Sequence, residues 1–168
     1  DKLKAYKMSV ITEAVTKGLA PDVPMKNSGI AWIGEIPEGW KCCPIKYFGD
    51  IIGGTGFPLE YQGNTGENYP FYKVSDIELS SDGKFLTTPN NSISEEIAKL
   101  IHAKIVKKQS IVYAKIGAAL LLNRRRIIIK DSVIDNNMSA FTPTININLN
   151  WCFYLFTIID FSLFIYPG

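Results

Sequence analysis

The feature that most constrains the fold is residues 110–141, which carry two β-branched apolar runs and three consecutive arginines. The apolar runs are residues 111–112 and 127–129, and the arginines, residues 124–126, come just before the second run. β-Branched side chains fit a pleated, half-buried surface, so both runs predict β-strands. A basic segment is therefore expected beside a rigid part of the fold.

Alternation along a strand assigns these side chains to two faces. On the first strand Val112, Ala114 and Ile116 share one side, and Ile111, Tyr113 and Lys115 share the other. On the second, Ile127 and Ile129 point one way, and Arg124, Arg126, Ile128 and Lys130 point the opposite way. We expect one face to be buried and the other to present basic groups and a tyrosine ring. These residues alone fit a merely solvated basic face equally well.

The composition is that of a globular protein, because 46% of the 168 residues are hydrophobic and 20% are charged. This length suits one domain with a core, or one domain plus an arm. The formal net charge is only +2, which is too small to indicate nucleic-acid binding by itself. Evidence for such binding must come from local clustering of basic residues.

The cysteines indicate a reduced, cytoplasmic setting. Cys42, Cys43 and Cys152 form an odd set, two of them are adjacent, and no CxxC spacing suggests zinc. Residues 151–166 are very apolar, with Asp160 as the one charge. This run falls short of the roughly 20 apolar residues that a bilayer span needs, so we expect a buried helix followed by a strand and no membrane contact.

The beginning of the chain predicts a helix followed by an irregular arm. Residues 2–17 have helical periodicity, with a single stripe formed by Leu3, Tyr6, Val10 and Ala14 and the neighbouring Ile11 and Val15. We expect this stripe to pack against a helix, from a second copy or from a further segment of the protein. Residues 20–40 are broken by prolines and glycines, and their apolar residues, Trp32, Ile33, Ile36 and Trp40, should pack the arm onto the domain.

Two shorter patterns also give predictions. The glycine-rich residues 53–56 lack the lysine of a P-loop, so a flexible loop is the better interpretation. Residues 144–150 alternate between apolar side chains and asparagines, which predicts a half-buried strand. Asn150 is then expected to cap a helix that begins at Trp151.

Catalytic chemistry is not visible in the sequence. The one histidine, His102, has no nucleophile or ligand cluster arranged around it, and the aspartates are scattered at turns. We therefore predict a non-catalytic binding protein with no metal and no cofactor of its own. Two alternatives stay open, a protein-interaction module and a small metal-dependent nuclease that uses the scattered aspartates.

Several stretches resemble the specificity subunit of type I restriction-modification systems. KLKAYKMSVITEAVTKGL (residues 2–19) resembles the end of its spacer helix, and MKNSGIAWIGEIPEGW (residues 25–40) resembles the segment leading into a target-recognition domain. Three further stretches resemble blocks inside that domain: YPFYKVSDI (69–77), SIVYAKIGAALLLNRRRIII (110–129) and IDNNMSAFTP (134–143). FIYPG (164–168) resembles the start of a late block.

The resemblance implies an α+β fold: a twisted, mixed and largely antiparallel sheet with short helices, preceded by a helix from a spacer coiled coil. It divides the chain into the spacer-helix end (1–19), a linker packed on the domain (20–44) and an incomplete target-recognition domain (45–168). In this family each such domain reads one half of a split target in double-stranded DNA. Methylation subunits carry S-adenosylmethionine, restriction subunits use ATP, and self-association through the helix is a further possibility.

Candidate DNA contacts are the basic and small polar residues near predicted strand ends and turns. Arginine, lysine and small polar donors suit phosphates, whereas arginine, asparagine and glutamine suit base edges. The residues of these types are Lys73, Ser75, Lys115, Asn123, Arg124, Arg126, Asn136 and Asn137. Alternation places Arg125 on the side of Ile127, which predicts a structural role for it.

Overall fold

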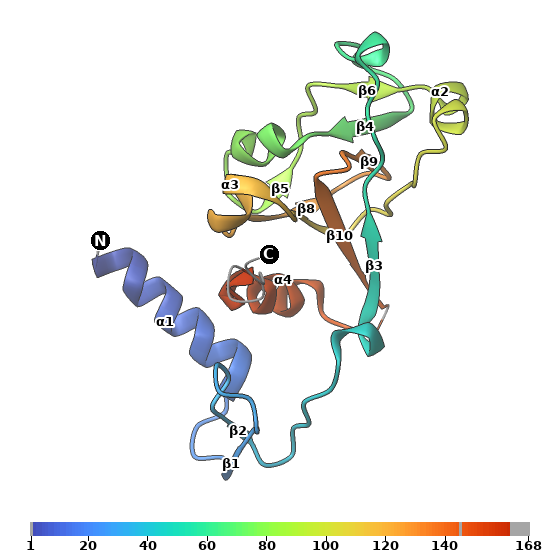
Figure 1. The fold of residues 1–168 in the computed structure, drawn as a ribbon. Helices are drawn as coiled ribbons and strands as arrows, with labels where there is room; N and C mark the ends of the chain where they lie inside the picture. Colours follow the sequence, from blue (N-terminus) through green and yellow to red (C-terminus); the bar gives the residue numbers. More distant parts are fainter. Residues whose placement is uncertain (1, 145, 162–168) are drawn as a thin grey trace.

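The protein combines a five-stranded sheet, a three-stranded sheet and a two-stranded hairpin with helices in the computed structural model, which describes residues 2–144 and 146–161 (Figure 1). The α-helices are α1 (Lys2–Lys17), α2 (Glu95–Leu100), α3 (Gly117–Leu121) and α4 (Leu149–Ile158). The 3-10 helices are η1 (Ile45–Tyr47), η2 (Leu59–Tyr61) and η3 (Val74–Leu79). No helix of the described residues is long and apolar enough to cross a membrane.

The larger sheet has the strand order β3-β10-β7-β8-β5 and is antiparallel except for its β8–β5 edge. Its strands are β3 (Gly49–Gly53), β10 (Met138–Pro143), β7 (Ile111–Ala114), β8 (Arg125–Ile128) and β5 (Phe85–Leu86). The smaller sheet, of order β6-β4-β9, consists of β6 (Ser92–Ile93), β4 (Tyr69–Tyr72) and β9 (Val133–Ile134). β4 pairs antiparallel with β6 and parallel with β9, so the predicted mixed, largely antiparallel α+β fold is confirmed.

The two central strands are buried on both faces, which corrects the prediction of one buried and one exposed face. Val112 and Ile128 join a core cluster beneath the smaller sheet, whereas Ile111 and Ile127 pack against Phe156 of α4. Alternation therefore correctly predicted which side chains share a face. It could not show that a helix covers one face while a second sheet covers the other.

The ends of these strands also differ from the prediction. Ile129 was expected to point into the core with Ile127, but it is 47% exposed because β8 ends at Ile128. Ile116 was expected to continue the face of Val112, but β7 ends at Ala114 and Ile116 is 52% exposed. The strands are thus shorter than the β-branched runs suggested.

Gly53 ends β3 and Gly54 is still hydrogen-bonded to β10, so the prediction of a flexible loop over residues 53–56 was wrong for its first two residues. Gly53 pairs with Ser139, and the backbone N–H of Gly54 donates to the Met138 carbonyl oxygen at 3.1 Å. A Cβ atom on Gly54 would lie 1.9 Å from the carbonyl oxygen of Asp135. Glycine is required at this position because two backbones approach closely.

Replacing Gly54 by alanine is therefore expected to lower the free energy of unfolding by about 1–3 kcal/mol, the usual cost of overpacking. Urea denaturation of the two proteins measures the difference. Gly56→Ala is the matched control, because a Cβ atom there would meet nothing within 4 Å. Equal stability of the Gly54→Ala and Gly56→Ala variants would show that the space between Gly54 and the Asp135 carbonyl group can accept a methyl group.

After β10, residues 146–147 form a turn and α4 follows, so the described residues of 144–150 do not form the predicted strand. α4 begins at Leu149, and the Asn148 side-chain oxygen accepts a hydrogen bond from the Trp151 backbone N–H at 3.0 Å. The cap is therefore Asn148 and not Asn150, whose side chain instead accepts from Lys84 Nζ at 2.8 Å. The strand expected after this helix, and the FIYPG block, lie outside the described residues.

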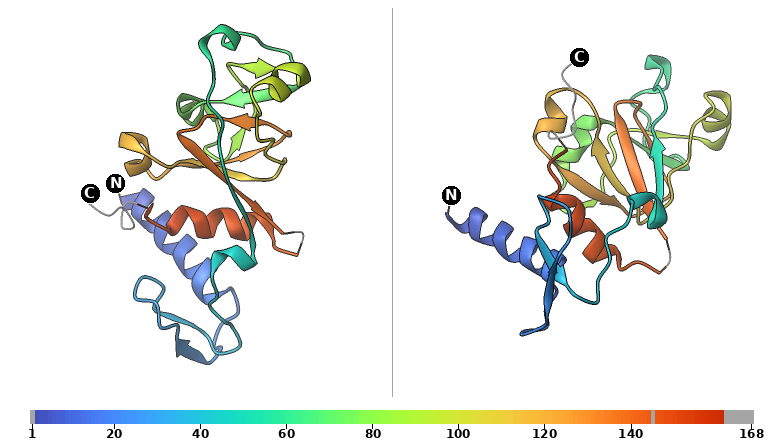
Figure 2. Two further views of the ribbon diagram at one scale, coloured as in Figure 1. Left: turned by 45° about the vertical axis from the view of Figure 1, so that its right-hand side comes forward. Right: turned by 60° about the horizontal axis from the view of Figure 1, so that its bottom comes forward.

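α1 packs on α4 through its C-terminal half, where Val15 and Thr16 are buried (Figure 2). The predicted stripe takes part in this contact only at its C-terminal end, where Val15 is buried and Ala14 is half-buried. Leu3, Tyr6 and Val10 are 75%, 69% and 46% exposed, respectively. The expected packing of the stripe against a helix is therefore seen for its last turn, and a helix that covers the remainder stays a prediction.

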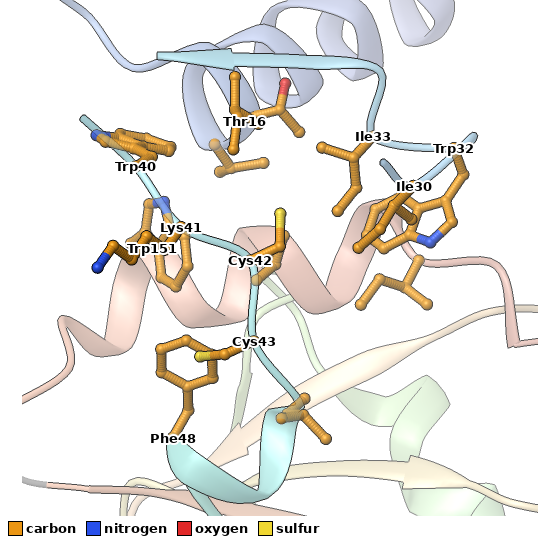
Figure 3. Close-up of a pocket in the computed structure, with 15 residues that line it drawn as sticks. Thr16, Ile30, Trp32, Ile33, Trp40, Lys41, Cys42, Cys43, Phe48 and Trp151 are labelled. Atoms are coloured by element: carbon orange, nitrogen blue, oxygen red, sulfur yellow. The ribbon is translucent and has the colours of Figure 1, made fainter. Parts of the chain in front are cut away.

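The arm folds as a hairpin of β1 (Met25–Asn27) and β2 (Glu35–Pro37), which contacts α1. The expected packing of its apolar residues is only partly seen: Ile36 is buried, whereas Trp32 and Trp40 are 40% and 37% exposed, and the arm, α1 and α4 together line an apolar cavity of about 250 Å³ (Figure 3). The cavity is lined by all three tryptophans of the chain, Trp32, Trp40 and Trp151. Tryptophan fluorescence should therefore respond to detachment of the arm.

Candidate nucleic-acid interface

The topology brings most of the candidate residues to one end of the five-stranded and three-stranded sheets. Since β7 runs antiparallel to β8 and β10, its last residue lies beside their first residues. Lys115 follows β7, Arg124 precedes β8 and Asn137 precedes β10. Lys73 follows β4, which runs parallel to β9, so it leaves the smaller sheet beside Asp135. We call this region the candidate end.

Lys115 and two asparagines form one corner of the candidate end. The backbone N–H of Lys115 donates to the Asn137 carbonyl oxygen at 3.0 Å, and the Asn137 N–H donates to a carboxylate oxygen of Asp135 at 2.9 Å. Lys115 and Asn136 are exposed, and Asn137 is half-buried. Among the described residues Lys115 has no ion-pair partner. This corner presents an available ammonium group beside an exposed amide on a backbone fixed by hydrogen bonds.

Lys73, Ser75 and Arg124 form the second corner. Lys73 Nζ donates to Gln62 Oε1 at 2.9 Å, and the guanidinium of Arg124 pairs with the Glu78 carboxylate at the surface. Ser75 is exposed, and Ser75 and Arg124 line one hollow of about 340 Å³ between η3 and α3. The two basic residues here, Lys73 and Arg124, are half-buried, and each already has a polar partner.

Asp76 holds this corner in place and was not recognised from the sequence. It is 1% exposed, and its carboxylate accepts from the Lys73 backbone N–H at 2.6 Å and from Asn90 Nδ2 at 2.7 Å. These bonds fix the start of η3, which positions Ser75 and Glu78. The sequence did hold a signal for this role. Asp76 lies three residues after Lys73, the first residue beyond β4, and a carboxylate at that position caps a helical turn.

Arg125 is buried, on the predicted side of its strand. It is 2% exposed, and its guanidinium carbon lies 5.5 Å from the Tyr113 ring centre and 4.0 Å from that of Phe161. One Nη donates to Asn123 Oδ1 at 2.5 Å and to the Ile159 carbonyl oxygen at 3.2 Å. Burial lowers its pKa to about 10, so the group is still charged at neutral pH. Arg125 joins β8 to the end of α4.

Two predicted contacts are engaged inside the protein. Asn123, held at φ +50°, accepts from Arg125 and donates to the Ile159 carbonyl oxygen at 3.1 Å. Arg126 is half-buried opposite Val112, and one Nη donates to the Arg125 carbonyl oxygen at 2.7 Å. Burial, then the neighbouring Arg124, lowers the pKa of Arg126. Neither side chain presents its polar head as freely as Lys115 does.

A second basic group lies at the opposite end of the larger sheet, where β7 begins and β8 ends. Its exposed lysines are Lys107, Lys108 and Lys130. Lys107 pairs with Asp131 at 2.8 Å, which raises the pKa of the lysine and lowers that of the carboxyl group. The two ends therefore carry comparable charge, and they differ in their asparagines and in their apolar content.

The described residues contain no group of three or more histidine, cysteine or acidic side chains that is arranged to hold a metal ion. His102 is exposed at the end of α2, with φ +51°. Cys152 is buried in the α4 cluster, and burial raises its pKa to about 12. What the candidate end offers chemically is charge and hydrogen-bond donors on rigid strands, which suits binding.

No family model matches the chain. Its fold is similar to the HsdS subunit from Thermoanaerobacter tengcongensis, with a TM-score of 0.63 at 16% identity over 96% of this chain and 35% of that one. It is also similar to a chain in a structure that describes complex assembly and conformational transition of the type I R-M system. There the TM-score is 0.60 at 17% identity, over 96% of this chain and 37% of that one. The chain thus spans about a third of each neighbour's length, and it shares their fold.

Proposed function

We propose that the chain is a target-recognition domain of a type I restriction-modification specificity subunit and that it binds double-stranded DNA in a sequence-specific, non-catalytic manner. The observation that carries the proposal is the gathering of Lys73, Lys115, Arg124, Asn136 and Asn137 at one end of two rigid sheets. The shared fold with HsdS and the sequence resemblance support the same function.

Within this proposal the residues have separate tasks. Lys115 and Arg124 neutralise phosphates, because they present cations at the surface and cations give most of the affinity for duplex DNA. Asn136 is exposed at the turn between β9 and β10, where an amide reaches a base edge, adenine being the preferred partner. Lys73, Ser75 and Asn137 support this contact, whereas Asn123 and Arg126 chiefly hold the strand ends.

The proposal also assigns the parts of the chain and their partners. Residues 1–19 end the spacer helix, 20–44 link it to the domain and 45–168 belong to the recognition domain. The exposed stripe of α1 (Leu3, Tyr6 and Val10) suits a coiled-coil partner, in a second copy or in the same subunit. Methylation subunits supply S-adenosylmethionine and chemistry, and restriction subunits supply ATP-driven steps, all in the cytoplasm.

Selection of bound duplexes from a randomised DNA pool, with the protein alone and with its methylation subunits, tests the function. We expect one half of a split target to be enriched, with an affinity that falls steeply as salt rises. We also expect no methylated base when the protein alone is incubated with S-adenosylmethionine and the enriched duplex. Recovery of no preferred sequence under either condition would favour the protein-interaction module, and metal-dependent cleavage would favour the nuclease.

A further inference from the structure

Gln62 lies beside Lys73 at the candidate end and was not recognised from the sequence. β3 ends at Gly53, which pairs with the start of β10, so the chain leaves the larger sheet at this end. The backbone N–H of Thr55 then donates at 2.8 Å to a carbonyl oxygen of β9, which ties the departing segment to the smaller sheet. Gln62 follows at the end of η2 and is half-buried. The segment thus brings a further amide to the end that carries Asn136.

Two hydrogen bonds fix the orientation of the Gln62 amide. Its Nε2 donates to the Phe57 carbonyl oxygen at 3.0 Å, and its Oε1 accepts from Lys73 Nζ at 2.9 Å. A carbonyl oxygen can only accept and an ammonium group can only donate, so these partners distinguish the oxygen of the amide from its nitrogen. The amide group is therefore held at both of its polar atoms.

Each of these two partners is itself held in place. The Phe57 ring stacks on the buried ring of Phe71, with the ring centres 3.6 Å apart. The Lys73 backbone N–H donates to the buried carboxylate of Asp76 at 2.6 Å. An amide fixed in this way loses little conformational freedom when it binds a further partner.

The amide keeps one donor and one acceptor for a partner outside the chain. It has two N–H hydrogens and two oxygen lone pairs, and its two hydrogen bonds among the described residues use one of each. In the major groove adenine presents an acceptor, N7, beside a donor, the N6 amino group, and glutamine is a usual partner of this pair. The base contact proposed for Asn136 is of the same type, so both amides would read the same groove.

We infer that Gln62 reads one adenine of the bound duplex through its remaining donor and acceptor, and that Lys73 is a positioning residue for this contact. The inference rests on the proposed function and adds a base contact to it. A glutamine that only fastened η2 would need the bond to Phe57 alone. The second bond uses a cation of the candidate end to orient a neutral amide, which is the arrangement that base recognition requires.

The test replaces each adenine of a duplex recovered by the selection above, in turn, with 7-deazaadenine, which lacks the N7 acceptor and still pairs with thymine. At one adenine we expect the analogue to weaken binding of the original protein about fivefold, as for one lost hydrogen bond. Gln62→Ala should bind the unmodified duplex about tenfold more weakly, as for one lost bidentate contact, and should no longer distinguish the two bases there. Asn136→Ala should still distinguish them at that adenine, because its own contact lies at another base.

Lys73→Met tests the positioning role, because methionine is similar in length and has no donor. This variant should also stop distinguishing the two bases at the same adenine, with an unchanged salt slope. A phosphate contact of Lys73 would instead make the slope shallower by about 0.9. Gln109→Ala is the matched control, since Gln109 is the other glutamine of the chain and lies exposed before β7, at the opposite end of the larger sheet. It should change neither quantity.

The comparison of two bases on one protein is unaffected by a general loss of stability in a variant. If Gln62→Ala lost affinity equally for adenine and 7-deazaadenine at every position, Gln62 would only hold the segment in place, and the inference would be wrong while the proposed function stands. A selected half-site without adenine in either strand, or one in which no 7-deazaadenine weakens binding, would have the same meaning. If the protein enriches no sequence, alone or with methylation subunits, the proposed function and the inference are both wrong.

Discussion

Changing Arg125 to alanine should lower the free energy of unfolding by about 3 kcal/mol or more. The guanidinium lies against the rings of Tyr113 and Phe161, and it donates to Asn123 and to the Ile159 carbonyl oxygen. Its removal deletes a desolvated cation–π contact and charged hydrogen bonds, and it leaves buried acceptors without a donor. The measurement is urea unfolding followed by circular dichroism and tryptophan fluorescence.

The neighbouring arginine is the natural control. Arg124 pairs with Glu78 at the surface, and exposed ion pairs contribute between about 0 and 1 kcal/mol, so Arg124→Ala should change stability by less than that. Arg125→Lys should recover only part of the loss, because an ammonium cannot stack flat on the rings or bond in two directions at once. Similar unfolding curves for Arg124→Ala and Arg125→Ala would contradict the structural role of Arg125.

Arg125 also shows how far the sequence could lead. Strand alternation placed it on the side of Ile127, and the pairing of Tyr113 with Arg125 agrees. Alternation says which side chains share a face, but it does not say what covers that face. The apolar α4 covers it, and the sequence around its start predicted the wrong cap and a strand where a turn lies. The result is the buried, structural arginine that alternation predicted, bonded to a partner at the end of α4 that the sequence did not identify.

The sequence predicted which types of residue lie at the candidate end, but it did not predict how they are arranged there. Lysines, asparagines and arginines near turns were found because polar residues gather at strand ends. That Lys73 lies near Asn136 follows from the parallel pairing of β4 with β9, strands that are far apart in sequence. The internal bonds of Asn123 and Arg126 also depend on tertiary contacts. The sequence shows three consecutive leucines at residues 120–122, although only the fold shows that Leu120 is buried while Leu121 and Leu122 are exposed.

The largest effect on binding is expected from removing two cations of the candidate end, Lys115→Ala with Arg124→Ala. If each side chain neutralises one phosphate, the slope of log affinity against log salt becomes shallower by about 1.8. At 0.15 M salt this corresponds to an affinity about 30-fold weaker, provided that the difference vanishes near 1 M. Both side chains lie at the surface, so the fold should stay intact. Titration of the selected duplex at several salt concentrations gives both quantities.

The opposite end of the sheet supplies a charge-matched control, Lys107→Ala with Lys108→Ala. Each pair joins one cation that is ion-paired with a surface carboxylate to one exposed lysine without an ion-pair partner among the described residues. Both double variants lower the net charge by the same amount, so a general effect of charge would weaken binding equally. Only phosphate contacts at the candidate end would make the loss of Lys115 and Arg124 weaken DNA binding more than the loss of Lys107 and Lys108. The reverse order, with a shallower slope for the Lys107 and Lys108 variant alone, would place the DNA at the other end of the sheet.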